Sequence, residues 1–534
     1  MVADKVTDMA RIAVIGAGMG AMAAAARLAV AGHRVVVYER GSTHGGALGR
    51  FEREGFGFDT GPGLLHLPAV YRDLFIKTGK EPLERCVELA QVDPAARHVF
   101  PDGTDLRLPN ASRAGVVSAL GEAFGEGSGE RWSDLVNRAR EAWDATRRPL
   151  LEEPLRADRA ELREDPYPAV RRRGWFRRGP VRPGTLAEVA ARELGAAGPV
   201  ALLESHALAH GLDPRTAPAS ATVLPYLEQT FGSWYALGGM RALADAVYER
   251  CRARKVEFVF GAEVTGIAIE DGRATGVVLA GRSGPSGAAA SGEVAEADAV
   301  VAGIDPSVLP PLLGGVRPWR DGDVQPAKDG AAVAGPGATS RFTVFLALTG
   351  ARSADAVHRT VVHARDRAAE LAAVFGGAAG TPARCPHPTV TVLRPDDPAG
   401  RPDAGHEAVT LTATVAAHGA LDWSDRAAAE EYADRLVAVA ERAVPGLRDR
   451  LLWREVRTPY DTAAQTGAVG GAVPAPALAG ADGRLLRPAN LTAIPGLYLA
   501  GGWAHPGGGL PHAGMSGAMV AGLITSGADW RGSQ

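Results

Sequence analysis

Two histidines lie in a glycine-rich run near the carboxyl end of the chain, GGWAHPGGGLPHAGMSG, which extends from Gly501 to Gly517. Histidine can exchange a proton or bind a metal near neutral pH. His505 and His512 have no Cys, Asp or Glu within the run and belong to no HExxH pattern, so the residues predict no metal site. Two roles stay open for each histidine: a hydrogen bond within the loop, or an acid–base role beside a cofactor.

The amino end carries a pattern typical of dinucleotide binding. An apolar run over 12–15 leads into a glycine turn at Gly16, a helix of small residues follows, and a second apolar run ends at Glu39. Gly18 lets a pyrophosphate approach the helix N-terminus, and an acid at the end of the second strand binds ribose hydroxyls. Because a carboxylate repels the extra phosphate of NADP, the pattern favours FAD or NAD. The predicted contacts here are Gly16, Gly18, Met19, Gly20, Ala21, Glu39 and Arg40.

A second glycine-rich stretch, GGALGRFEREGFGFDTGP, follows over 45–62. An NAD-binding fold needs no such loop here, and at this point the chain resembles the phytoene (carotenoid) desaturase family of the flavin amine-oxidase-like superfamily. In that family a GG-R-A stretch contacts the FAD pyrophosphate. This sequence has Ala47 where arginine is usual, and Arg50 is a candidate replacement; a plain surface turn is the alternative. The resemblance implies FAD contacts at Gly45, Gly46, Ala47, Gly61 and Pro62.

The resemblance covers nearly the whole chain and keeps the family's motif order. It implies an α/β fold in which a Rossmann-type FAD-binding domain is interleaved with an α+β substrate domain. The stretch over 225–279 matches the place where family chains return to the FAD domain, and there Val264 is expected to meet the adenine. The predicted FAD-binding segments are 1–74, 236–310 and 485–534, and the predicted substrate-binding or cap segments are 75–235 and 311–484.

The closing segment resembles the family's final signature, a strand and a glycine-rich loop that leads into a helix. A flavin that accepts hydride at N5 gains negative charge near N1 and the C2 carbonyl, and free N–H groups at a helix N-terminus stabilise that charge without a metal. His505 matches the histidine of the family's HPGGG stretch, whereas His512 is a less usual residue there. The implied cofactor contacts are Gly501, Gly502, His512, Ala513 and Gly514.

The resemblance implies an FAD-dependent dehydrogenase (desaturase) that moves hydride from a hydrophobic, isoprenoid or carotenoid-like substrate to flavin N5 and forms a C=C bond. The alternatives are an oxidase or dehydrogenase of another secondary metabolite, amines included; a redox-neutral isomerase or saturase; and a non-enzymatic binder of prenylated proteins. The candidate catalytic residues are His505, His512 and Glu228. The candidate substrate-pocket residues are Trp234, Tyr235 and Trp503, of which Trp234 and Tyr235 could equally be core aromatics.

Composition limits the classes of partner. The chain has 534 residues, 58 Lys and Arg against 61 Asp and Glu, and a formal net charge of −3. No global basic excess exists for binding nucleic acid, so none is expected as a partner. Three widely spaced cysteines exclude a disulfide framework and favour a cytoplasmic location. No segment has about 20 uninterrupted apolar residues, the length that a membrane span needs.

One basic segment leaves two interpretations open. Residues 170–179, VRRRGWFRRG, place five arginines around Trp175 and Phe176. Arginines and aromatics together are typical of peripheral contact with a membrane surface, here the inner face of the membrane, and a solvated basic loop is the alternative.

Overall fold

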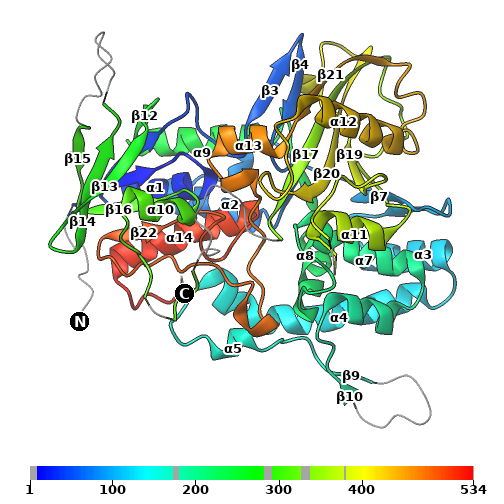
Figure 1. Ribbon diagram of the computed structural model, residues 1–534, viewed down its shortest axis with the longest axis horizontal. Helices are drawn as coiled ribbons and strands as arrows, with labels where there is room; N and C mark the ends of the chain where they lie inside the picture. Colours follow the sequence, from blue (N-terminus) through cyan, green and yellow to red (C-terminus); the bar gives the residue numbers. More distant parts are fainter. Residues whose placement is uncertain are drawn as a thin grey trace.

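A parallel five-stranded sheet carries the predicted dinucleotide turn. The structure is a computed structural model that describes residues 9–171, 180–281, 292–320, 322–325, 337–377 and 380–532 (Figure 1). In the sheet, β1 lies between β2 and β16, and all pairings are parallel. The strands in spatial order are β12 (Glu257–Phe260), β2 (Arg34–Glu39), β1 (Arg11–Ile15), β16 (Ala299–Ala302) and β22 (Leu497–Leu499).

Both faces of this sheet are covered, which is why its strands are almost entirely apolar. Ile12 and Val14 of β1 point to one face and pack in a core with α1, α2, α9 and α14. Ala13 and Ile15 point to the other face and pack against an antiparallel three-stranded sheet. The helices are α1 (Met19–Val30), α2 (Ala69–Gly79), α9 (Arg241–Ala253) and α14 (Leu510–Ser526); the strands are β13 (Val264–Glu270), β14 (Arg273–Leu279) and β15 (Val294–Glu296).

A seven-stranded sheet forms the other end of the molecule (Figure 1). It is mixed: the β18–β7 pair is parallel and the other pairs are antiparallel. Its strands in spatial order are β21 (Leu451–Arg457), β17 (Thr339–Thr349), β20 (His406–Ala416), β19 (Val390–Leu393), β18 (Arg359–Val362), β7 (Ala96–Val99) and β8 (Asp105–Leu108). The strands β7 and β8 thus join partners from much later in the chain.

Alternate side chains of β17 point to opposite faces of the sheet and belong to two different hydrophobic cores. Phe342 and Val344 pack against α12 (Arg426–Ala440). Phe345 and Ala347 point to the opposite face, as a period of two requires, and pack with phenylalanines of the β3–β4 hairpin (Arg50–Arg53 and Phe56–Asp59).

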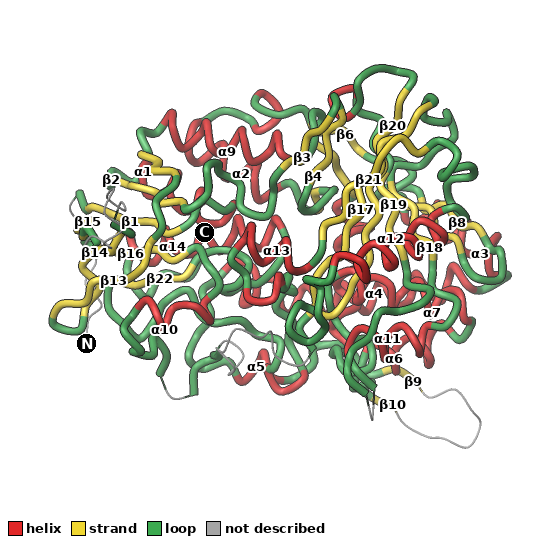
Figure 2. The backbone as a smooth tube through the Cα atoms, turned by 45° about the horizontal axis from the view of Figure 1, so that its top comes forward, coloured by secondary structure: helices red, strands yellow, loops and turns green. Residues whose placement is uncertain are grey.

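Helices of the first half lie beside the seven-stranded sheet (Figure 2). They share one hydrophobic core that also includes Met515 of α14 at its edge. A small antiparallel sheet of β5 (Leu65–His66), β11 (Ser233–Ala236) and β6 (Leu89–Gln91) links this region to the parallel sheet. The larger helices of this core are α3 (Arg113–Phe124), α4 (Ser128–Arg147), α7 (Ala197–Ala209) and α8 (Val223–Phe231), and α6 (Leu186–Val189) is a shorter one. The other helices are α5 (Ala160–Arg163), α10 (Leu309–Leu312), α11 (Arg367–Phe375) and α13 (Pro459–Thr466). A two-stranded ribbon pairs β9 (Val170–Arg171) with β10 (Pro180–Val181).

The predicted fold class is confirmed: the chain combines a parallel α/β sheet with a separate mixed sheet and helices. Every strand of the parallel sheet lies in a segment predicted to bind FAD, and every strand of the seven-stranded sheet lies in a predicted substrate segment. The β3–β4 hairpin crosses this division, because it belongs to 1–74 and packs on the seven-stranded sheet. The exact domain boundaries stay a prediction.

In the described ranges, no helix has both the length and the apolar character to cross a membrane. The core of the predicted basic patch, 172–179, lies outside the described residues.

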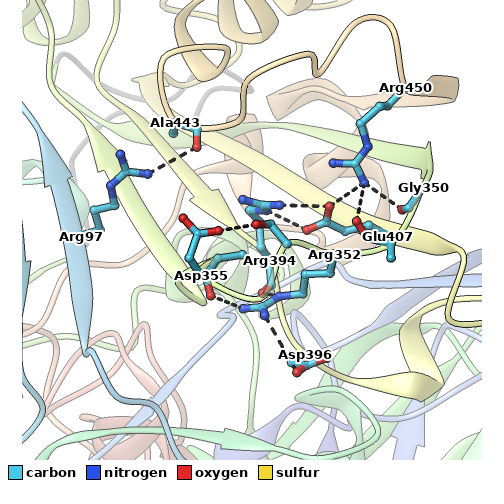
Figure 3. A network of polar contacts seen from close by, with 12 residues as sticks. Arg97, Gly350, Arg352, Asp355, Arg394, Asp396, Glu407, Ala443 and Arg450 are labelled. Atoms are coloured by element: carbon cyan, nitrogen blue, oxygen red, sulfur yellow. Dashed lines mark hydrogen bonds and ion pairs between the residues drawn. The ribbon is translucent and has the colours of Figure 1, made fainter.

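A buried carboxylate ties three strands of the seven-stranded sheet together (Figure 3). Glu407, at the start of β20, is 1% exposed and accepts two hydrogen bonds from Arg394, at 2.7 and 3.0 Å. Arg450, just before β21, donates to the same carboxylate at 2.9 Å and to the carbonyl of Gly350 at 2.8 Å. Because all three side chains are largely buried, each charge depends on the others for compensation.

We expect Glu407→Ala to lower the free energy of unfolding by about 3–5 kcal/mol, because it leaves Arg394 buried without its counter-charge. The matched control is Glu455→Ala: Glu455 lies on β21, its side chain is 44% exposed, and its ion pair with Arg53 is 3.9 Å long. That change is expected to cost less than about 1 kcal/mol. Denaturant unfolding followed by tryptophan fluorescence measures both, and equal losses would contradict the account of the network.

Candidate functional site

The dinucleotide turn joins the carboxyl end of β1 to the start of α1. Gly16 has φ +87°, a left-handed conformation that favours glycine. Gly18 precedes α1 as its N-cap, with no side-chain cap for the first-turn N–H groups, and a Cβ added there would meet no atom within 4 Å. Glu39 accepts hydrogen bonds from the N–H of Ala17 at 2.8 Å and of Gly41 at 2.7 Å, which hold its carboxylate beside the turn. The turn can thus receive an anionic group at a helix N-terminus with an acid next to it.

The second glycine loop lies directly on the first. The N–H of Gly45 donates to the carbonyl of Ala17 at 2.8 Å, and a Cβ on Gly46 would lie 3.0 Å from the Cα of Gly18. A Cβ on Gly61 would lie 2.3 Å from the carbonyl oxygen of Ala47, so the turn containing Gly61 and Pro62 packs against the loop.

Arg50 does not reach this loop in place of the missing arginine. Its guanidinium donates to the carbonyls of Gly238 at 2.6 Å and Ala399 at 2.5 Å and pairs with Glu52. Arg241, at the start of α9, is the arginine that contacts the loop: it donates to the carbonyl of His44 at 2.7 Å. No sequence motif predicts that contact.

The predicted adenine residue and Arg40 lie at the far end of β2. The N–H of Ala262 donates to the carbonyl of Glu39 at 2.9 Å, and Val264 and Tyr38 both pack against the core on that side of the sheet. Val264 is therefore close to the acid that is expected to bind ribose. The Arg40 guanidinium instead contacts the carbonyls of Ala464 and Gln465 at the end of α13, at 3.0 and 3.2 Å.

The carboxyl-terminal loop meets the amino-terminal helix through glycines. A Cβ on Gly20 would lie 2.5 Å from the Cα of Gly501 and 2.9 Å from the carbonyl oxygen of Ala513. A Cβ on Gly517 would lie 2.5 Å from the carbonyl oxygen of Gly20. Gly501 itself has φ +100°, and a Cβ there would meet no atom within 4 Å. We call this contact between α1 and the start of α14 the glycine seam.

Two polar side chains that carry no sequence motif hold the loop in place. The buried amide nitrogen of Asn490 carries two hydrogens and lies within donating distance of the carbonyls of Leu499 and His505 and of the hydroxyl of Ser516, at 3.0, 2.8 and 3.0 Å. The N–H of Gly501 donates to the same hydroxyl at 3.0 Å. Asn490 and Ser516 thus fix the course of the chain around Gly501.

His505 is fully buried in this loop. Its Nε2 lies 3.0 Å from the carbonyl oxygen of Glu153, which can only accept, so Nε2 carries the hydrogen. Burial lowers the pKa of His505 to about 4, so the ring is neutral at pH 7. This contact gives His505 a positioning role that ties the loop to the segment after α4; its catalytic role stays a prediction.

His512 is the third residue of α14. Burial lowers its pKa to about 4, with smaller contributions from His210 and His505. Its Nδ1 is buried and has no hydrogen-bond partner among the described residues. The N–H of Ala513 is already bonded to the carbonyl of Gly509 at 2.9 Å, and Pro511 has no N–H, so the free N–H groups of this turn belong to His512 and Leu510.

Glu228 lies on α8, in an ion pair with Arg359. The arginine guanidinium holds the pKa of Glu228 far below its usual range despite the desolvation that burial imposes. A carboxylate held this firmly in its charged form is a weak base, because a catalytic base works best with a pKa near the working pH.

The predicted pocket aromatics make contacts of their own. Tyr235 is 6% exposed and donates its hydroxyl hydrogen to Asp397 at 2.9 Å. Trp234 is half-buried, donates from its indole to the carbonyl of Phe231 at 2.9 Å, and lies under the guanidinium of Arg72. Trp503 is half-buried in the turn after Gly502. A substrate contact for any of the three stays a prediction.

Comparison with known proteins assigns the chain to a protein family. The family model described as flavin containing amine oxidoreductase matches residues 22–525. This chain belongs to that family. FAD, the oxidoreductase class and the resemblance to carotenoid desaturases are thereby confirmed as predicted.

Curated relatives of this flavin oxidoreductase cover nearly its full length at modest identity. A 4,4'-diapolycopene oxygenase of Methylomonas sp is 26% identical over 97% of this chain and 99% of its own. A neurosporene-forming phytoene desaturase of Cereibacter sphaeroides is 27% identical, with 95% and 92% covered. A hydroxyneurosporene desaturase of Rubrivivax gelatinosus is 28% identical, with 96% and 92% covered.

Solved structures share the fold of this flavin oxidoreductase. An oxidoreductase from Methanosarcina mazei has a TM-score of 0.60 at 15% identity, covering 96% of this chain and 99% of its own. A putrescine oxidase bound to putrescine has a TM-score of 0.55 at 13% identity, covering 97% and 100%.

The residues fit FAD. Gly18 and Gly501 both face open space, the helix starts at α1 and α14 have no side-chain caps, and Glu39 stands beside the first of them. Asp305 follows the carboxyl end of β16, and Arg487 lies near it. Burial lowers the pKa of Arg487 to about 10, so its guanidinium is still cationic at pH 7. No group of three His, Cys, Asp or Glu within the described part of the chain is arranged to hold a metal ion.

Two glycines of the flavin oxidoreductase test the site separately. We expect Gly18→Ala to leave the melting temperature of the FAD-free protein unchanged, because no atom lies near the new Cβ, but to reduce FAD retention through purification. Gly20→Ala is expected to lower the melting temperature with and without FAD, because its Cβ overlaps the backbone of Gly501.

The control is Gly121→Ala on α3, where a Cβ also meets no atom within 4 Å and no FAD contact is predicted. FAD absorbance per protein and differential scanning calorimetry measure both effects. The assignment would be contradicted if Gly18→Ala retained FAD as the wild type does.

Burial of neutral histidines predicts a pH dependence of stability. The pKa values of His505, His512 and His210 are lowered to about 4, whereas the unfolded chain titrates near about 6.5. Between these values the unfolded state binds more protons, so the free energy of unfolding falls as pH falls from about 6.5 to 4. Thermal unfolding at pH 7 and pH 5 measures this loss.

His512→Gln is expected to lose less stability between pH 7 and pH 5 than the wild type. The exposed His387→Gln should behave as wild type, and an identical loss in all three proteins would contradict the prediction.

Proposed function

We propose that this chain is an FAD-dependent dehydrogenase that desaturates a hydrophobic, isoprenoid or carotenoid-like substrate. The observation that carries the proposal is that full-length relatives are named for reactions on such polyenes, and three of them on hydroxylated ones. The named alternatives, an amine or other metabolite oxidase, a redox-neutral isomerase or saturase, and a non-enzymatic binder, are not favoured by these relatives.

The packing around α14 supports an apolar substrate. One hydrophobic core extends from Val70 of α2 and Met515 of α14 to Leu224, Tyr226 and other residues of α8. A chain entering from the substrate side would therefore meet apolar side chains on its way to the first turn of α14.

Each part of the site has a separate task in this proposal. FAD supplies the hydride acceptor. The free N–H groups of His512 and Leu510 present the positive end of α14 to negative charge. His505 and Asn490 keep the loop in position, and the neutral ring of His512 adds no charge beside an apolar substrate. With Glu228 held in its ion pair, the described residues of the site offer no strong base. Conjugation spreads the positive charge that hydride loss creates, and the proton that then leaves the adjacent carbon to complete the C=C bond can pass to a weak base such as water.

Anaerobic titration of the FAD-loaded protein tests the proposal. We expect an acyclic polyene in detergent micelles to bleach the flavin's visible absorption and to yield a product with one more double bond. Putrescine is expected to leave the spectrum unchanged. Bleaching by the amine alone would overturn the proposal, and an isomerised polyene without net bleaching would favour the isomerase.

A membrane-held substrate would require contact with the bilayer surface. The Arg-rich segment 170–179 is the predicted place for that contact, on the cytoplasmic side, and both the contact and the location stay predictions.

A further inference from the structure

Five polar side chains of the interior gather next to the start of α14. We call them the imidazole cluster: His66, His206, His210, Glu228 and Arg359. They come from β5, from α7 and its C-cap, from α8 and from the first position of β18, and α8 contacts both α7 and β5. Figure 1 shows α7 and α8 below the seven-stranded sheet. The proposed function gives these residues no task.

The three imidazoles share one tautomer. The Nδ1 atoms of His66, His206 and His210 lie 3.3, 3.0 and 2.8 Å from the carbonyl oxygens of Gly232, Leu202 and His206. A carbonyl oxygen only accepts, so each Nδ1 carries a hydrogen and each Nε2 presents a lone pair. None of the three Nε2 atoms has a hydrogen bond to another described residue.

The charges of the cluster cancel and leave an excess of acceptors. Burial lowers the pKa of all three histidines, so they are neutral at pH 7. Glu228 and Arg359 form one ion pair of zero net charge. His206 Nε2 lies 3.9 Å from Glu228 Oε2, so two acceptors face each other with no hydrogen between them. Arg359 supplies the donors of the cluster: its two terminal nitrogens each donate to Glu228, and its Nε is buried and has no partner among the described residues.

Three members of the cluster keep some accessible surface although protein surrounds them. His66 and His210 are partly exposed, and the side chain of Glu228 is 13% exposed. The cluster is next to the first turn of α14, because His210 is close enough to His512 to affect its titration, and β5 contacts α14.

We propose that the imidazole cluster binds a hydroxyl group of the substrate, so that the oxidised compound is a hydroxylated polyene rather than a plain hydrocarbon. This inference rests on the proposed function. A hydroxyl donates one hydrogen bond to an imidazole Nε2 or to Glu228 and accepts one from Arg359, which matches the free groups of both kinds.

Other end groups match less well. A hydrocarbon leaves the acceptors unpaired in the interior, which costs free energy. A carboxylate has no hydrogen to donate, so it would leave the imidazole Nε2 atoms and Glu228 without a donor. An ammonium group would lose its hydration beside a carboxylate that Arg359 already neutralises, so its own charge would stay uncompensated.

Matched ligands test the inference on the FAD-loaded protein. The probes are an acyclic polyene hydrocarbon, the same polyene with one terminal hydroxyl, and putrescine as the ammonium probe. Dissociation constants come from quenching of tryptophan fluorescence in detergent micelles. We expect the wild type to bind the alcohol about tenfold more tightly than the hydrocarbon, the value of one net hydrogen bond to buried partners.

Variants then locate the preference. His206→Phe and His210→Phe are expected to bring the ratio of the two dissociation constants close to one. His210→Gln, whose side-chain oxygen also accepts, is expected to keep part of the preference. The control is His387→Phe, an exposed histidine of the same domain, which should keep the wild-type ratio. FAD content and melting temperature verify that each variant is folded.

The outcomes separate the two proposals. Equal binding of alcohol and hydrocarbon by the wild type would overturn the hydroxyl inference, while bleaching by either polyene would still uphold the proposed function. The hydroxyl inference would also be overturned if His206→Phe, His210→Phe and His210→Gln all kept the wild-type preference for the alcohol. It would be overturned too if the wild type and the control bound putrescine and these three variants did not. No bleaching by either polyene would overturn the proposed function, and the binding ratio would still decide the inference.

Discussion

The glycine seam is the contact on which the rest of the structure depends. The first helix of the chain and the last one approach until the backbones touch, which is possible only because Gly20 and Gly517 have no side chains. This contact brings two helix N-termini, those of α1 and α14, to the same edge of the parallel sheet. Segments at opposite ends of the chain thereby build one site for a long, anionic cofactor with a ring that must receive charge.

The second constraint is how the protein treats polar groups in an apolar interior. Near the seam the rings of His505 and His512 are neutral. In the seven-stranded sheet a buried glutamate is compensated by two arginines, and on α8 Glu228 is compensated by Arg359. Against this background the free acceptors of the imidazole cluster are unusual, since they are the groups that a ligand would have to satisfy.

Much of the fold and the cofactor site could be predicted because the motifs are contiguous. The turn at Gly16, the acid at Glu39 and the closing loop each lie within short stretches where residue type and backbone conformation are linked. Residues whose contacts join distant segments of the chain belong to no such motif. Asn490 and Ser516 are common polar residues, and Arg241 precedes an ordinary helix, so only the structure reveals their contacts.

The imidazole cluster could not be read from the sequence for the same reason: its members lie on four elements that are far apart in the chain. Lone histidines carry no pattern, and the sequence does not reveal that Glu228, a candidate catalytic residue, has Arg359 as its partner. The structure adds a contact that residue type does not show: the hydroxyl of Tyr235 donates to Asp397, while its predicted place near the substrate stays a prediction.

A crystal structure of the FAD-loaded protein with a hydroxylated polyene that lacks a reactive C–H bond tests the central claim most directly. The account predicts the flavin ring beside Gly501 and the first turn of α14, with the polyene leading from it to a hydroxyl within hydrogen-bond distance of the imidazole cluster. A flavin ring away from α14, or a polyene whose hydroxyl lies in solvent, would contradict it.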